Sequence, residues 1–157
     1  MASLAEPAFP GDDGSVDPQL SAALSAYDAD GALAPVLVAL GRARVLVPVV
    51  AVRGETAVGS DKEADMATVM MTGADGRQGL LAFSSLETLQ RWRPDARPVP
   101  VWAREAASAA LGEGATALLL DLAGPVRAVV ETEDLQHLAA GDELVAVGAS
   151  WAWTSPA

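Results

Sequence analysis

The chain has 157 residues, of which 51% are hydrophobic and 20% are charged, and its 21 acidic and 10 basic residues give a formal net charge of −11. This length and hydrophobic content are typical of one folded domain and exclude a wholly disordered chain. The acidic excess disfavours direct binding of nucleic acid or of an anionic membrane, but it is compatible with a basic protein partner. The absence of cysteine excludes disulfides, thiolate nucleophiles and Cys-ligated zinc.

The first fifteen residues contain proline, glycine and acidic residues without periodicity, which predicts a flexible acidic arm over residues 1–15. This segment has no basic stretch followed by an apolar one, so no signal peptide is predicted. The longer apolar stretches that follow are interrupted by proline, which disfavours a membrane-spanning helix. We therefore expect a cytoplasmic chain that makes no membrane contact.

Two helices are predicted at the start of a single domain that we place at residues 16–149. Asp17 followed by Pro18 is typical of a helix N-terminus, because the carboxylate caps free backbone N–H groups and proline fits the first turn. Apolar residues then follow at helical spacing. A second short helix is expected over residues 33–40, ending at Gly41.

Strand signals come next. The β-branched run at residues 45–52 predicts a strand, and Pro48 within it predicts an edge strand or a bulge. The apolar runs at 66–72 and 78–83 flank the turn residues Asp75-Gly76, which predicts a β-hairpin.

The remaining residues predict helices alternating with short strands. Ser84 and Glu87 have the spacing of a capping box at the start of a helix that ends at Arg93-Pro94, and Thr132 is expected to cap a later helix. Between these positions we predict a strand at 99–101, a helix at 102–111, and strands at 116–121 and 126–130. The order of elements predicts an α+β (mixed α/β) domain in which N-terminal helices precede a mixed, mostly antiparallel sheet of about five to six strands.

Four carboxylates are the candidate metal ligands. Asp61, Glu63 and Asp65 lie in a polar loop, and Asp75 lies in the hairpin turn that follows. Carboxylate oxygens suit divalent cations, and the loop can reach the turn if it folds over the hairpin. The spacing matches no EF-hand, so these residues are candidates only, and no metal site or cofactor is predicted.

Two tryptophans near the C-terminus are the candidate partner-binding residues. Trp151 and Trp153 lie in residues 150–157, which we expect to form a tail that docks on the domain or on a partner, because indoles seldom stay free in solvent. His137, the lone histidine, follows Glu133 and Asp134 at helical spacing, so one of these carboxylates can bond its ring. No nucleophile motif accompanies this histidine, and no catalytic residue is predicted.

Several motifs carry a family resemblance. They are the stretch from Asp61 to Arg77 (DKEADMATVMMTGADGR), its continuation GLLAFSS and LQRW, and the shorter matches VLVP, ARPVPV and LDLAGP. Together they resemble the N-terminal domain of SseB-like proteins of the actinobacterial type over most of the chain. The resemblance implies a compact α/β fold and brings no established reaction, cofactor or catalytic residue. Phe83-Ser84-Ser85 stands where the family usually has Phe-Thr-Ser, which preserves the cap chemistry.

These observations favour a non-catalytic protein-binding or adaptor module. Sensing of a small molecule or divalent cation through residues 61–65 and the hairpin turn is the alternative, and a carboxylate-dependent hydrolase is a weaker one. A homodimer formed through an unpaired strand edge, such as the one expected at Pro48, is compatible with each of these functions.

Overall fold

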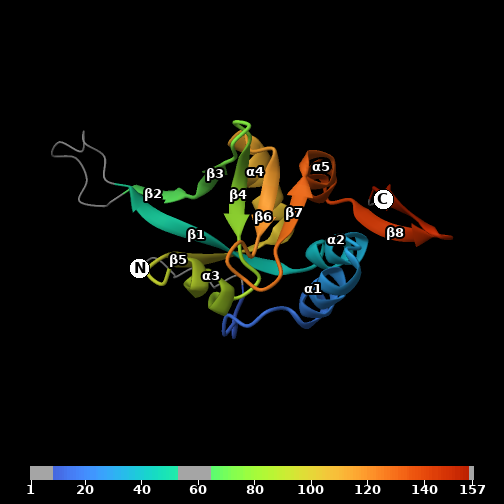
Figure 1. Cartoon of the computed structure of the whole chain (residues 1–157), viewed down its shortest axis with the longest axis horizontal. Helices are drawn as coiled ribbons and strands as arrows, with labels where there is room; N and C mark the ends of the chain where they lie inside the picture. The colour runs from blue at the N-terminus through green and yellow to red at the C-terminus, as the bar shows by residue number, and fades with distance from the viewer. Residues whose placement is uncertain (1–8, 53–64, 156–157) are drawn as a thin grey trace, which may run out of the picture.

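The computed structural model describes residues 9–52 and 65–155, and these ranges contain five helices and nine strands (Figure 1). The helices are α1 (Pro18–Asp30), α2 (Ala34–Leu40), α3 (Leu86–Trp92), α4 (Ala103–Gly112) and α5 (Thr132–Ala140). The strands are β1 (Arg44–Val52), β2 (Asp65–Thr68), β3 (Met70–Thr72), β4 (Gln78–Ala82), β5 (Arg97–Trp102), β6 (Ala117–Leu120), β7 (Ala128–Glu131), β8 (Glu143–Val147) and β9 (Ser150–Thr154). None of the described helices is long and apolar enough to span a bilayer.

The strands form three small sheets, with the orders β2-β1-β5, β3-β4-β6-β7 and β8-β9. All paired strands are antiparallel except β4 and β6, which run parallel and are connected through α3, β5 and α4. The predicted α+β class, with its mixed and mostly antiparallel pairing and its N-terminal helices, is confirmed. The sheet differs from the prediction in being divided.

The division occurs at Val69, inside the run that we predicted as one strand. Val69 separates β2, which pairs with β1, from β3, which pairs with β4, and its carbonyl accepts a bond of 3.1 Å from the Leu81 N–H. The first two sheets also meet where Leu46 and Phe83 exchange backbone hydrogen bonds of 2.7 and 2.8 Å. The two sheets are therefore joined at two points.

The expectation that Pro48 marks an edge or a bulge is wrong, because β1 lies at the centre of its sheet. Pro48 pairs with Pro98, and Leu46, two residues earlier, directs its N–H to Phe83 and away from β5. Alternate residues of an antiparallel strand direct their backbone groups to the same side, so Pro48 also faces away from β5. Pro48 lies between the bridge at Leu46 and the first β2 pair at Val49. No ladder hydrogen bond on this side requires a donor at position 48, so proline is tolerated there.

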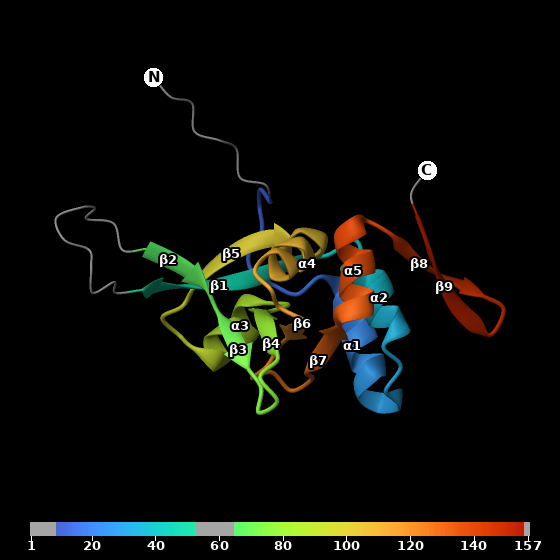
Figure 2. The same cartoon turned by 90° about the horizontal axis from the view of Figure 1, so that it is seen from above.

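The main core lies between the second sheet and the helices α1, α2, α4 and α5 (Figures 1 and 2). Leu80, Leu118 and Val130 point from β4, β6 and β7 into this core and have no exposed surface. On the other face, α3 covers part of the sheet, where Phe83 and Leu89 are fully buried in a second cluster. The rest of that face is open.

Two caps differ from their predictions by one residue. The capping box of α3 uses Ser85 and Thr88, whose side chains each accept the other's backbone N–H, in place of Ser84 and Glu87. Ser84 is released for a different contact, described below. Thr132 is the first residue of α5 and donates its hydroxyl to the Thr116 carbonyl at 2.6 Å.

Candidate functional site

An apolar groove lies between helices α1 and α2 on one side and the β8-β9 hairpin on the other. Its volume is about 700 Å³, and Arg42 is the single charged side chain among its described lining residues. The apolar lining includes Ala22 and Ala26 of α1, Val38 of α2 and Ala146 and Trp151 of the hairpin. Three other hollows among the described residues are smaller, at about 340, 240 and 70 Å³.

The α1 wall follows directly from its sequence. The predicted cap is confirmed: Asp17 accepts bonds from the Gln19 and Leu20 N–H groups at 2.9 and 3.1 Å, with Pro18 in the first turn. Leu20 is buried in the core. The groove side carries small alanines, so the backbone of α1 can be approached closely by another segment.

The hairpin forms the opposite wall. Gly148, with a φ of 61°, and Ala149 make a tight turn between Val147 and Ser150. Neither strand was predicted, and the expected tail is a paired strand through Thr154. The register places Ala146 opposite Trp151, and Leu144 opposite Trp153, so these four side chains share the face that lies toward the body.

Trp153 anchors the base of the hairpin on α5. Its indole stacks on the His137 ring with centroids 4.8 Å apart and an interplanar angle of 9°, and its N–H donates to Asp134 at 3.3 Å. His137 contacts the carboxylate of Asp142 at 2.7 Å through Nδ1. The histidine does bond a carboxylate, but that carboxylate is Asp142, and Asp134 accepts the Trp153 N–H instead.

Trp151 has a different environment from Trp153. Its side chain is 46% exposed at the rim of the apolar groove, and Val38 and Val147 nearby in the fold are 39% and 57% exposed. The two candidate partner-binding residues therefore have different roles. Trp153 holds the hairpin in place, whereas Trp151 presents an apolar surface to solvent.

The sequence analysis missed a buried polar cluster at the carboxyl ends of the parallel strands β4 and β6. Asp121 is 3% exposed and accepts three hydrogen bonds: from the Ser84 N–H at 2.7 Å, the Ser84 hydroxyl at 2.5 Å and the Thr88 hydroxyl at 2.8 Å. It also has a φ of 57°, the one positive value among the described residues other than glycine. Within the described chain no buried side-chain polar atom lacks a partner.

This cluster lines a cavity of about 240 Å³ together with Ser21, Ser25 and Arg91. The carboxyl ends of parallel strands are common ligand sites in α/β proteins. Here, however, both oxygens of Asp121 accept hydrogen bonds from Ser84 or Thr88, so the carboxylate ties the start of α3 to the end of β6. The signal available in the sequence was the run LDLAGP, which combines a lone acidic residue with turn residues at the end of a strand.

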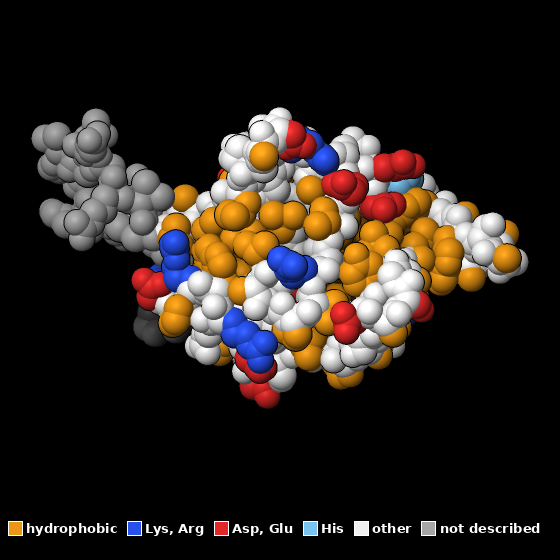
Figure 3. Space-filling view, in the orientation of Figure 1, with side chains coloured by type: hydrophobic (Ala, Val, Ile, Leu, Met, Phe, Trp, Pro, Cys, Tyr) orange, Lys and Arg blue, Asp and Glu red, His pale blue; other side chains and the backbone are white. Residues whose placement is uncertain are grey.

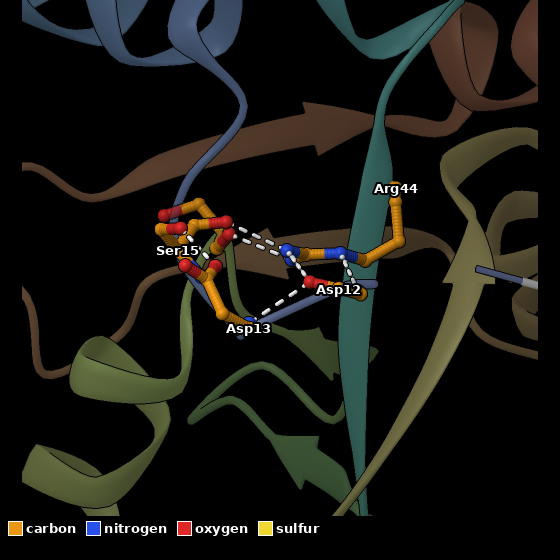
Figure 4. A network of polar contacts seen from close by, with 6 residues as sticks. Asp12, Asp13, Ser15 and Arg44 are labelled. Carbon is orange, nitrogen blue, oxygen red and sulfur yellow. Dashed lines mark hydrogen bonds and ion pairs between the residues drawn. The ribbon is translucent and has the colours of Figure 1, made fainter. Parts of the chain in front are cut away.

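Arg44 extends this polar network to the N-terminal segment (Figure 4). Its guanidinium donates to the Ser84 carbonyl at 3.0 Å, to the Ser15 carbonyl at 2.6 Å and to both oxygens of Asp12 at 2.8 Å. The Ser15 hydroxyl and N–H donate to Asp13 and hold the pKa of its carboxyl below its usual value. The described residues 9–15 therefore contact the domain, while residues 1–8 of the predicted arm lie outside the described residues.

The predicted metal ligands are not brought together in the described part of the chain. Asp61 and Glu63 lie outside the described residues, and the backbone of Asp65 belongs to β2. Asp75 accepts a bond of 3.0 Å from the Arg77 N–H within the hairpin turn. No group of three or more potential ligands occurs among the described residues.

A second apolar surface covers the open face of the β3-β4-β6-β7 sheet, and Figure 3 shows hydrophobic side chains gathered there. Met71 and Val129 are 39% and 42% exposed on this face. Leu119 lies across Gly79, where a Cβ atom would come within 2.9 Å of it. The hollow holds about 340 Å³ and is rimmed by the Arg77–Glu131 ion pair at 3.0 Å.

The chain matches a model of a protein family over most of its length. The model of the SseB protein N-terminal domain matches residues 20–137, well over half of the chain. No curated protein and no solved structure matches the chain. The match includes the Asp121 cluster and most of α1 and ends at His137, so the β8-β9 hairpin lies beyond it. The chain belongs to the SseB protein N-terminal domain family.

Proposed function

We propose that this chain is a non-catalytic protein-binding module that holds an apolar segment of a partner protein in the groove beside Trp151. The exposure of Trp151, 46% at the rim of the apolar groove, is the observation that carries the proposal. Tryptophan is strongly enriched among residues that dominate binding energy, because it buries a large rigid surface with little loss of conformational entropy. Monomeric proteins seldom leave such an apolar concavity without a function.

The partner segment is apolar where it meets the groove and basic around that contact. The lining offers Ala22, Ala26 and Val38 on one wall, so the segment gains energy mainly by burying apolar side chains. The chain as a whole carries a net charge of −11, which attracts a basic partner and repels an acidic one.

A comparison of two tryptophan variants tests the proposal. Tagged wild-type protein and Trp151→Ala are purified from the native host, and the proteins that co-elute are identified by mass spectrometry. We expect one partner to co-elute stoichiometrically with the wild type and to be lost with the variant. The same partner, once purified, should bind Trp151→Ala at least tenfold more weakly by calorimetry, since truncating a central interface tryptophan costs about 2 kcal/mol or more.

Trp102→Ala is the matched control, because Trp102 is 42% exposed but does not line the groove. It should retain the partner. Equal loss of the partner from both variants would show that exposed indoles bind without specificity, and equal retention would show that the groove is not the contact. The thermal unfolding temperature of both variants should equal that of the wild type, so that loss of the partner is not caused by unfolding.

A further inference from the structure

The β8-β9 hairpin has a free edge along β9. In an antiparallel pair, alternate residues bond across the ladder while those between them direct their N–H and C=O groups outward. Val147 and Ser150 flank a two-residue turn and therefore form a hydrogen-bonded pair. The alternation then makes Trp151 and Trp153 members of non-bonded pairs, whose backbone N–H and C=O groups point away from β8. No third strand is paired with this sheet among the described residues. The backbone of β9 can therefore accept another strand.

This edge lacks the features that normally protect edges from pairing with another chain. Strand β5 has Pro98 and Pro100 at the positions that face away from β1, which removes the outward N–H groups. Strand β7 is short and ends at the exposed Glu131. From Leu144 to Ala157, by contrast, there is no charged residue, and proline is absent from both strands of the hairpin.

Any second chain that pairs with this edge must also approach a molecule with a large negative charge. Two copies that each carry −11 repel one another over most of their surface. Strand β9 is where they can meet without opposing carboxylates, and Figures 1 and 2 show the hairpin standing away from the body, within reach of a second molecule. A lone two-stranded hairpin is also marginal in stability, so additional strands stabilise it.

From this edge we infer that the chain forms a homodimer in which β9 pairs antiparallel with β9 of a second copy. Closed two-fold symmetry requires the same surface from both copies, and a strand edge provides it. An axis at Ala152 sets Trp151 opposite Trp153 of the other copy, which brings the outward backbone groups together and forms an aromatic cross-strand pair. The axis also places the two Ala152 side chains directly opposite each other.

Ala152 supplies the test, because it is exposed, does not line the apolar groove and is not part of the His137 stack. Sedimentation velocity and light scattering on the full chain should give twice the monomer mass of 16.0 kDa for the wild type at micromolar concentration. Ala152→Glu and Ala152→Lys should each give the monomer mass, because like charges meet at the axis. An equimolar mixture of the two should recover the doubled mass, since opposite charges then face each other.

Val147→Glu is the matched control, since Val147 is 57% exposed on β8 and lies away from the β9 edge. It should retain the doubled mass. A wild-type protein that is monomeric throughout the micromolar range overturns the proposal, as does a doubled mass that survives both Ala152 substitutions. A failure to recover the dimer on mixing also overturns it. The Ala152 variants keep the two proposals separate, because Ala152 does not line the groove and both variants should bind the partner as the wild type does.

Discussion

Asp121 is the residue on which most of the buried polar bonding depends. Replacing it with alanine leaves the Ser84 N–H and hydroxyl without their acceptor and leaves the Thr88 hydroxyl only the Ser85 carbonyl, which costs about 2–4 kcal/mol of unfolding free energy. Asp121→Asn keeps one acceptor oxygen and tolerates the positive φ, so we expect a loss of about 1 kcal/mol. Urea unfolding followed by circular dichroism measures both losses.

Asp121→Gly separates the lost hydrogen bonds from the backbone strain. It removes the same carboxylate as alanine but relieves the φ of 57°, so it should be more stable than the alanine variant by about 1 kcal/mol. Equal stability of the Ala and Asn variants would mean that the bonds to Asp121 contribute little. The bonded pair Ser84 and Asp121 is 37 residues apart in the sequence, and a pairing at that separation cannot be read from local patterns.

At the scale of elements, the hairpin depends on Trp153 and not on Trp151. Trp153→Ala removes the stack on His137 and the bond to Asp134, an anchor worth about 2 kcal/mol in apolar burial and aromatic contact. Hydrogen exchange of residues 143–154 should become at least tenfold faster, while exchange in β4 and β6 stays unchanged. When exchange is measured on the monomer, Trp151→Ala should leave the hairpin protected; equal acceleration by both variants would contradict this division of roles.

The elements that the sequence predicts well are those with local signals. Asp17-Pro18, the Asp75-Gly76 turn and the stop at Arg93-Pro94 all lie where patterns placed them. The hairpin escaped prediction because β8 and β9 are five residues each and are stabilised by contacts with α2 and α5 that are distant in sequence. The prediction from Pro48 failed for a related reason. Only the pairing of β1 with β2 and β5 shows that a central strand has a position where no N–H is needed.

At the scale of the whole molecule, the net charge of −11 has opposite effects on the two proposed interfaces: it favours binding of the partner and opposes dimer formation. A basic partner is attracted from a distance, so added salt weakens its binding. Two copies of the chain repel one another, so added salt strengthens their dimer. Raising the ionic strength from about 10 to 150 mM shortens the Debye length from about 30 to 8 Å, which screens both effects.

The sign of the salt dependence is therefore the sharpest whole-molecule prediction. Over that range the dimer dissociation constant should fall several-fold by sedimentation, and the partner dissociation constant should rise several-fold by calorimetry. The dependence of the dimer should persist in Trp102→Ala, which does not alter the charge. A dimer that weakens with salt would mean that ion pairs hold it together, which the uncharged β9 edge cannot supply, because its residues from Ser150 to Thr154 carry no charge.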